Sequence, residues 1–475
     1  MSNAFRPVAL SLALLLATGL ARADATQTLL LRDPTASASR IVFTYAGDLW
    51  SVDRNGGDSL RLTSDPAADL APAFSPDGKT LAFNRQHGDN LEVYVMPAAG
   101  GTPRRLTWHP GPDRVTGWSA DGQRVLFASR REAAPTGELQ AWEVAPDGGA
   151  PSKVMDADFF QGRWSGARLA YIPFAPGYSG LFGGPAGWKG YRGGLVPAVH
   201  LIDPAKGTLD VVPGERATHI EPLWVGGRLH FIADREDMAF NLYAWDEATR
   251  TARRLTDERP WDVRAADAFG DAIVYEAGGR LKELDTRSGA VREIVVRLAA
   301  ELPEARPRWR DVGEGVEDAA ISPAGKRVLL TARGEVFSVP VKDGAVRNLS
   351  RSEDEREYTA LWSPKGDRVA WVVQRGDAQS LVVRDQAGLE APREWPLGPG
   401  FHRLSAFAPD GEHIAYQDDA LALWVVHAKD GERTRIDVQH RRADVHVAFA
   451  PDSRWIAYTR AQPNHLTELM LATLD

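Results

Sequence analysis

The stretch FSPDGKTLAF, residues 74–83, joins two apolar runs through a Ser-Pro-Asp-Gly turn. Proline presets the backbone for such a turn and glycine accepts the left-handed conformation, so the chain reverses direction there. Related stretches occur at 119–127 (SADGQRVLF), 322–330 (SPAGKRVLL), 363–371 (SPKGDRVAW), 408–416 (APDGEHIAY) and 450–458 (APDSRWIAY). The chain therefore repeats one strand-turn-strand unit.

Each repeat predicts four short strands. Around the quoted stretch these are APAF, TLAF, LEVYVM and PRRLTW, at residues 71–74, 80–83, 91–96 and 103–108. Polar or glycine-containing breaks separate them, so consecutive strands pair as an antiparallel meander. The first strand of a unit often ends in Phe or Trp.

Apolar residues of the second strands give the period of the repeat. They are Ile41, Leu81, Val125, Leu169, Leu229, Ile273, Val328, Val369, Ile414 and Ile456. A period of roughly 40–45 residues with four strands per unit is typical of a β-propeller. A β-solenoid has shorter repeats and an array of β-sandwiches lacks such regular self-similarity, so the pattern favours the propeller.

Two anchor spacings are longer than the period. The first contains a Gly- and aromatic-rich insertion at 174–197, and the second contains the polar, proline-bearing segment 297–312, which we interpret as a linker. Six units precede this linker and four follow it. We therefore expect an all-β fold of tandem β-propellers: a six-bladed ring over 24–296 and about four blades of a second, incomplete ring over 313–475.

The last unit has second and third strands but no fourth. Exposed strand edges promote aggregation. We expect residues 24–296 to fold alone, and residues 312–475 to be unstable, to close as a small ring or to pack on a partner.

The N-terminus predicts export. An apolar run at 7–20 is followed by Ala21-Arg22-Ala23, which fits a signal peptide over residues 1–23 with cleavage near Ala23 and Asp24. As a membrane anchor the run is short, because a span needs about 20 residues. No later segment is apolar enough to cross a bilayer. We expect a periplasmic or secreted protein.

Composition and missing motifs exclude several classes of catalytic and binding site. The chain has no Cys, which excludes disulfides, thiolate metal sites and a Cys nucleophile. Its net charge of −8 argues against nucleic acid as a partner. Neither a G-x-S-x-G elbow nor an H-E-x-x-H motif occurs, and His440 and His446 are interpreted as surface histidines rather than metal ligands. We predict no catalytic residue, no metal and no cofactor.

One pair of residues is a candidate for substrate binding. Arg130 and Arg131 follow a predicted second strand, where two guanidinium groups facing the tunnel mouth would hold a carboxylate. The alternative is a solvated loop pair. Trp188 and Tyr191 in the insertion fit loop anchors better than ligand platforms.

Several stretches resemble the tricorn protease family: residues 29–57, 61–111 and 331–372, together with WKGYRGG at 188–194. The resemblance covers nearly all of the chain after the signal peptide. It implies a six-bladed and a seven-bladed propeller followed by a serine peptidase half with a PDZ domain. This sequence contains no counterpart of that catalytic half. The family's use of basic residues in the first propeller to anchor the substrate's carboxyl end points to Arg130 and Arg131.

The functional hypothesis is the propeller portion of an exported tricorn-type serine peptidase, which gates and docks peptides and has no activity alone. Its partners would be peptides and a catalytic PDZ-containing half or further copies of the chain. The alternative is a stand-alone periplasmic TolB-like propeller that binds a protein or peptide. A lyase or hydrolase with its site in the tunnel is a third possibility, against which the lack of a convergent His or carboxylate set counts.

Overall fold

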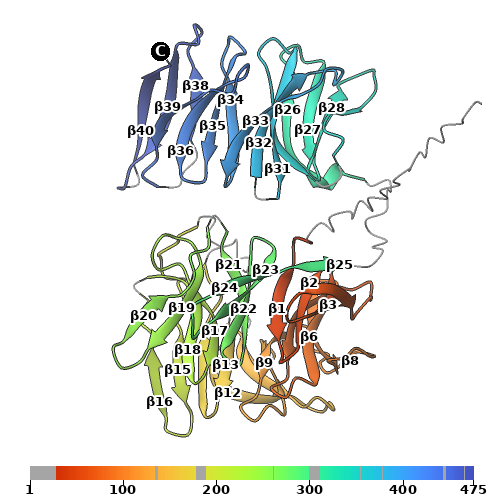
Figure 1. Cartoon of the computed structure of the whole chain (residues 1–475), viewed down its shortest axis with the longest axis vertical. Helices are drawn as coiled ribbons and strands as arrows, with labels where there is room; N and C mark the ends of the chain where they lie inside the picture. Colours follow the sequence, from red (N-terminus) through yellow and green to blue (C-terminus); the bar gives the residue numbers. More distant parts are fainter. Residues whose placement is uncertain are drawn as a thin grey trace, which may run out of the picture.

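The computed structural model describes residues 28–133, 137–177, 189–214, 216–259, 261–298, 311–352, 355–376, 378–441, 445–464 and 466–474. Within these ranges the chain forms β-strands joined by turns, and its helical content is one 3₁₀ turn, η2 (Gly313–Gly315) (Figure 1). No helix of this part of the chain is long and apolar enough to cross a membrane. The predicted all-β propeller fold is confirmed. The predicted signal peptide lies outside the described residues.

The described strands form ten sheets, six before residue 299 and four after residue 310. The first six sheets comprise β1 (Arg32–Ala36), β2 (Arg40–Tyr45), β3 (Asp48–Asp53), β4 (Gly57–Arg61) and β25 (Val296–Leu298); β5 (Asp69–Phe74), β6 (Thr80–His87), β7 (Asn90–Pro97) and β8 (Arg104–Arg105); β9 (Arg114–Trp118), β10 (Val125–Ser129), β11 (Gln140–Val144) and β12 (Ser152–Asp158); β13 (Gln161–Ser165), β14 (Arg168–Ile172), β15 (His200–Asp203) and β16 (Thr208–Val211); β17 (His219–Val225), β18 (Arg228–Ala233), β19 (Asn241–Asp246) and β20 (Thr251–Arg254); β21 (Val263–Phe269), β22 (Ala272–Ala277), β23 (Arg280–Asp285) and β24 (Val291–Ile294).

The other four sheets comprise β26 (Val316–Ile321), β27 (Arg327–Ala332), β28 (Glu335–Pro340) and β29 (Arg347–Asn348); β30 (Arg356–Trp362), β31 (Arg368–Arg375), β32 (Ala378–Asp385) and β33 (Arg393–Pro399); β34 (His402–Phe407), β35 (His413–Asp418), β36 (Ala422–His427) and β37 (Arg433–Val438); β38 (Val447–Phe449), β39 (Trp455–Ala461) and β40 (Thr467–Thr473). In every sheet consecutive strands pair antiparallel, as the repeat predicts. We call the six sheets the first ring and the four sheets the second series.

The repeated turn connects the first and second strands of a sheet. Between β5 and β6 the Ser75 hydroxyl donates to the Asp77 carboxylate at 2.6 Å and accepts the Thr80 N–H at 3.0 Å. Gly78 closes the turn in the left-handed region, with φ +69°, where a side chain is unfavourable. The same hydroxyl–carboxylate bond recurs between Ser119 and Asp121 at 2.6 Å. The residues of the repeated stretch thus define a hairpin.

Tryptophans near the ends of first strands connect neighbouring sheets. In each case the indole N–H donates to a backbone carbonyl in the first strand of the preceding sheet. These bonds run from Trp118 to Ala73 (3.2 Å), from Trp224 to Arg163 (2.9 Å) and from Trp362 to Ala320 (3.0 Å). The repeat therefore specifies how one sheet sits on the next as well as the hairpin.

The second strands form the core. Of the ten apolar residues that set the sequence period, nine are fully buried at 0% exposure. The exception is Val328 of β27, which is only partly buried. It lies in the first sheet of the second series, where only the sheet of β30–β33 follows as a neighbour in that series.

Contacts between the first and sixth sheets close the first ring. Strand β1 packs against both β5 and β21. The Thr35 hydroxyl of β1 donates to the Asp267 carboxylate of β21 at 2.6 Å, and the same carboxylate accepts the Ala36 N–H at 3.2 Å. On the outside, β25 pairs parallel with β4, so that Arg297 lies opposite Asp58. Strand β25 therefore includes residues 297 and 298 of the predicted linker; residues 299–310 lie outside the described ranges.

The second series is a row in which β26, β30, β34 and β38 pack in succession (Figure 1). Its end sheets carry exposed apolar side chains: Ile321 of β26 is 67% exposed, and Leu469 of β40 is 79% exposed. An edge-to-face contact between Trp261 and Phe401, with ring centroids 5.1 Å apart, joins the first ring to the second series.

The inter-sheet tryptophan bond gives a matched pair for a stability test. Replacing Trp224 with Phe removes a donor that is hydrogen-bonded, whereas the indole N–H of Trp164, in the preceding sheet, is buried without a partner. We expect Trp224→Phe to lower the free energy of unfolding by about 1 kcal/mol more than Trp164→Phe, because only the first change breaks a bond. Urea unfolding followed by circular dichroism measures both. Equal losses would show that the bond contributes nothing.

Candidate functional site

The first strands of the six sheets enclose a cavity on the axis of the first ring. Its volume is about 80 Å³. The lining residues are Asp33, Pro34, Ala71, Pro72, Ala73, Val115, Thr116, Gln161, Arg163, Glu221, Ala265 and Ala266. They come from β1, β5, β9, β13, β17 and β21, so every sheet of the ring contributes. We call this cavity the axial channel.

Three lining residues have an unusual backbone. Asp33, Ala71 and Glu221 have φ values of +48°, +49° and +47°, in a region that side chains disfavour. Each lies where the pairing of first and second strands shifts register, which marks a β-bulge. A bulge re-aims a side chain that regular pleating would point elsewhere. Here the bulges place two carboxylates in the axial channel.

One sequence feature accompanies all three bulges. Proline follows each of the three residues, at Pro34, Pro72 and Pro222. Within sheets, proline is confined to edge strands, strand starts and bulges. Each of these first strands is an edge strand of its sheet. Proline is tolerated both at an edge and at a bulge, so these three prolines accompany the bulges without predicting them.

The channel carboxylates are held by hydrogen bonds. The Glu221 carboxylate accepts the Gln161 side-chain N–H at 2.6 Å and lies 4.0 Å from the Arg163 guanidinium. The Glu276 carboxylate of β22, which is 5% exposed, accepts the Asp33 backbone N–H at 3.3 Å. These contacts place three acidic groups around one part of the axis.

Burial makes these carboxylates hard to ionise. Burial raises the pKa of Asp33, and Arg32 offsets part of the rise. Burial also raises the pKa of Glu221, against the opposing effect of Arg163. For Glu276, burial and the neighbouring charge of Asp33 raise the pKa to about 7. The Glu276 carboxyl group, which contacts the channel residue Asp33, therefore changes its charge near neutral pH.

The two arginines predicted to bind substrate have different surroundings. Arg131 forms an ion pair of 2.6 Å with Asp113, which is fully buried, and its guanidinium lies over the rings of Phe127 and Trp142. Arg130 is exposed. The structure thus assigns a structural contact to Arg131, while substrate binding by Arg130 and Arg131 stays a prediction.

A third arginine, which the sequence analysis missed, lies near Arg130. Arg114 begins β9, directly before the channel residues Val115 and Thr116. Burial and the like charge of Arg130 lower the pKa of Arg114. Arg32 occupies the corresponding first position of β1, directly before Asp33. Arginines therefore stand next to channel-lining residues in two sheets of the ring.

Part of the insertion 174–197 contacts residues next to the fifth and sixth sheets. Arg192 forms an ion pair of 2.6 Å with the buried Asp234, and Lys189 forms one of 2.6 Å with Asp262. Residues 178–188, including Trp188, lie outside the described ranges. Among the described residues, no group of three or more His, Asp or Glu is arranged to hold a metal ion.

The comparisons with known proteins agree on one family. The model of the tricorn protease N-terminal beta propeller domain matches residues 28–290. The chain is 29% identical over 461 residues to tricorn protease homolog 1 of Streptomyces coelicolor, covering 93% of this chain and 42% of that protein. It is 24% identical over 457 residues to the tricorn protease homolog of Saccharolobus solfataricus, and this match covers 93% of this chain and 40% of that protein.

A solved structure shows the same fold. The crystal structure of the tricorn protease aligns with a TM-score of 0.52 at 19% identity and covers 94% of this chain and 44% of that one. The chain thus spans about two fifths of the length of the relatives it matches. Because the family model covers more than half of the chain, this protein belongs to the family of the tricorn protease N-terminal beta propeller domain.

Proposed function

We propose that this chain is the propeller portion of an exported tricorn-type serine peptidase, in which the first ring gates and docks peptide substrates. The observation that carries the proposal is the axial channel, to which every sheet of the ring contributes. A channel of about 80 Å³ excludes folded protein and leaves only an extended segment or a chain end as an occupant. In this proposal, peptide cleavage falls to a catalytic part other than the propellers.

The charges around the axial channel suggest which end of a peptide is held. Arg130 is an exposed cation and lies near Arg114, which directly precedes channel-lining residues. Guanidinium groups bind carboxylates well. Within the channel, burial raises the pKa of Asp33 and of Glu221, so these acidic groups offer no positive charge to a peptide carboxylate. A peptide's carboxyl terminus would therefore be held by the arginines beside the channel rather than by the acidic groups within it. This arrangement supports docking of the peptide by its carboxyl end.

Export and location belong to the same proposal. Residues 1–23 have the pattern of a signal peptide, and the sequence has no cysteine that an oxidising compartment would pair. We propose the periplasm or the cell exterior as the place of action. A catalytic PDZ-containing half, or further copies of the chain, would complete the peptidase.

The first test of this proposal uses the absence of cysteine in the native sequence. Ala71→Cys places a single thiol on the channel wall, and Ala290→Cys places one on an exposed turn as the control. We expect an unstructured peptide with a free carboxyl terminus to slow alkylation of the Ala71→Cys thiol by a small maleimide, with no effect on the control. Mass spectrometry measures the alkylation rates. Equal rates with and without peptide would contradict docking at the channel.

The same alkylation assay tests whether Arg130 binds the peptide's carboxyl end. When Arg130→Ala is added to Ala71→Cys, the peptide should need a concentration at least about fivefold higher to slow alkylation of the thiol equally, because one charge-assisted bond is lost. A peptide amide, which lacks the terminal charge, should respond little to this change. Arg253→Ala, at an exposed arginine of β20, serves as the matched control.

A second prediction concerns pH. Glu276 has a pKa of about 7 in the folded protein, above its ordinary value of 4.5, so the folded state binds this proton more tightly than the unfolded state. The resulting stability is fully present below about pH 4.5 and is lost as the pH rises through about 7. Glu276→Gln should therefore lose less stability than the wild type between about pH 5 and 8, by up to roughly 3 kcal/mol.

Urea unfolding at a series of pH values measures this difference. Glu432→Gln, at an exposed glutamate, is the control and should follow the wild type. Parallel profiles for wild type and Glu276→Gln would show that Glu276 titrates normally.

A further inference from the structure

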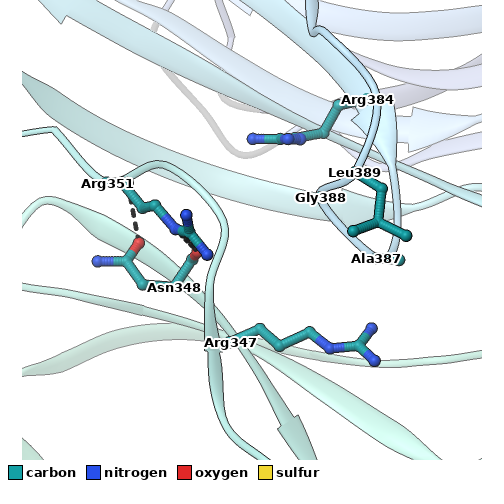
Figure 2. Close-up of a pocket in the computed structure, with 7 residues that line it drawn as sticks. All are labelled: Arg347, Asn348, Arg351, Arg384, Ala387, Gly388 and Leu389. Atoms are coloured by element: carbon teal, nitrogen blue, oxygen red, sulfur yellow. Dashed lines mark hydrogen bonds between the residues drawn. The ribbon is translucent and has the colours of Figure 1, made fainter.

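Three arginines line a second cavity, in the second series. It has a volume of about 240 Å³ and lies between the sheets of β26–β29 and β30–β33. Its lining residues are Arg347, Asn348, Arg351, Arg384, Ala387, Gly388 and Leu389. Figure 2 shows Arg384 on one side and Arg347 and Arg351 on the other, with the Leu389 side chain beside them. We call this cavity the arginine pocket.

Among the described residues, no carboxylate forms an ion pair with the three guanidinium groups. Arg384 donates to the carbonyl oxygens of Leu349 at 2.6 Å and Glu390 at 3.1 Å, and its Nε–H is buried without a partner. Arg351 donates to the Asn348 carbonyl at 3.3 Å. In the part of the chain that the structure describes, neither these two arginines nor Arg347 has an ion-pair partner. Like charges facing one space repel each other unless an anion joins them.

The nearby carboxylates are engaged elsewhere. Asp385 accepts the backbone N–H groups of Ala387, Leu389 and Glu390 at 3.0, 3.1 and 2.8 Å, which fixes the loop at one side of the pocket. The Glu335 carboxylate accepts the Asn348 side-chain N–H. Neither carboxylate lines the pocket.

A fourth arginine increases the positive charge. Within the described part of the chain, Arg327 of β27 donates to neutral oxygens, those of Ser338 and Ala345. Burial and the like charge of Arg347 lower the pKa of Arg327. The electrostatic field in this region therefore favours an anion, although the chain as a whole carries a net charge of −8.

We propose that the arginine pocket binds a phosphate group, either as the free anion or as a small phosphomonoester. Arginine forks match the oxygens of phosphate, and three of them offer more charge than one carboxylate neutralises. A volume of about 240 Å³ accommodates a phosphate with a small organic group. Leu389, which is 87% exposed, offers an apolar contact for that group.

Isothermal titration of the full chain at low salt tests the proposal, with inorganic phosphate, O-phosphoserine and succinate as probes. We expect phosphate or phosphoserine to bind more tightly than succinate. Arg347→Ala and Arg351→Ala should each weaken the binding at least about fivefold, because each removes one guanidinium. Arg253→Ala, in the first ring, is the matched control and should leave the affinity unchanged. Arg384 is left intact because it also supports the backbone of Leu349 and Glu390.

The outcomes separate the sources of the phosphate. Tighter binding of phosphoserine supports a phosphomonoester, and tighter binding of inorganic phosphate supports the free anion. Failure of both to bind, tighter binding of succinate, or affinities unchanged in Arg347→Ala and Arg351→Ala with unaltered melting temperatures would overturn the proposal.

Discussion

The packing of one four-stranded sheet on the next is the constraint on which the structure depends. A single sheet of this size cannot bury its two faces, so each sheet needs a neighbour on either side. The first ring meets this requirement by closure: Thr35 of the first sheet bonds to Asp267 of the sixth, and β25 adds to the outer edge of β4. The end sheets of the second series have a neighbouring sheet of that series on one side only, and apolar side chains such as Ile321 and Leu469 are exposed there.

Closure also creates the axial channel. The six first strands converge on the axis, and bulges at Asp33 and Glu221 place two carboxylates there on backbone that side chains disfavour. Such strain persists only where the surrounding packing holds it, and it concentrates at functional positions. The acidic groups at the channel, with Arg130 and Arg114 beside it, are the features on which the proposed docking of peptide ends rests.

Much of the fold could be predicted from the sequence, because the period of the apolar anchors and the Ser-Pro-Asp-Gly turn are local features. Nine of the ten anchors are fully buried, and Val328 departs because its sheet ends a series. The candidate site was less predictable. Arg130 and Arg131 look equivalent in sequence, yet Arg131 pairs with the buried Asp113, eighteen positions away on the chain. An ion pair such as that of Arg131 with Asp113 depends on how neighbouring strands align. The spacing of residues along the sequence does not determine that alignment.

Disulfide formation across the closing strand tests ring closure most directly. Asp58 is exposed and Arg297 is half-buried; they lie opposite each other on β4 and β25 and form an ion pair of 2.8 Å. In this cysteine-free chain, Asp58→Cys with Arg297→Cys should oxidise within one molecule, since paired strands bring the thiols into reach. Mass spectrometry of the oxidised monomer would then find residues 58 and 297 linked. Thiols that stay reduced, or that link only separate molecules, would contradict a ring closed between its first and sixth sheets.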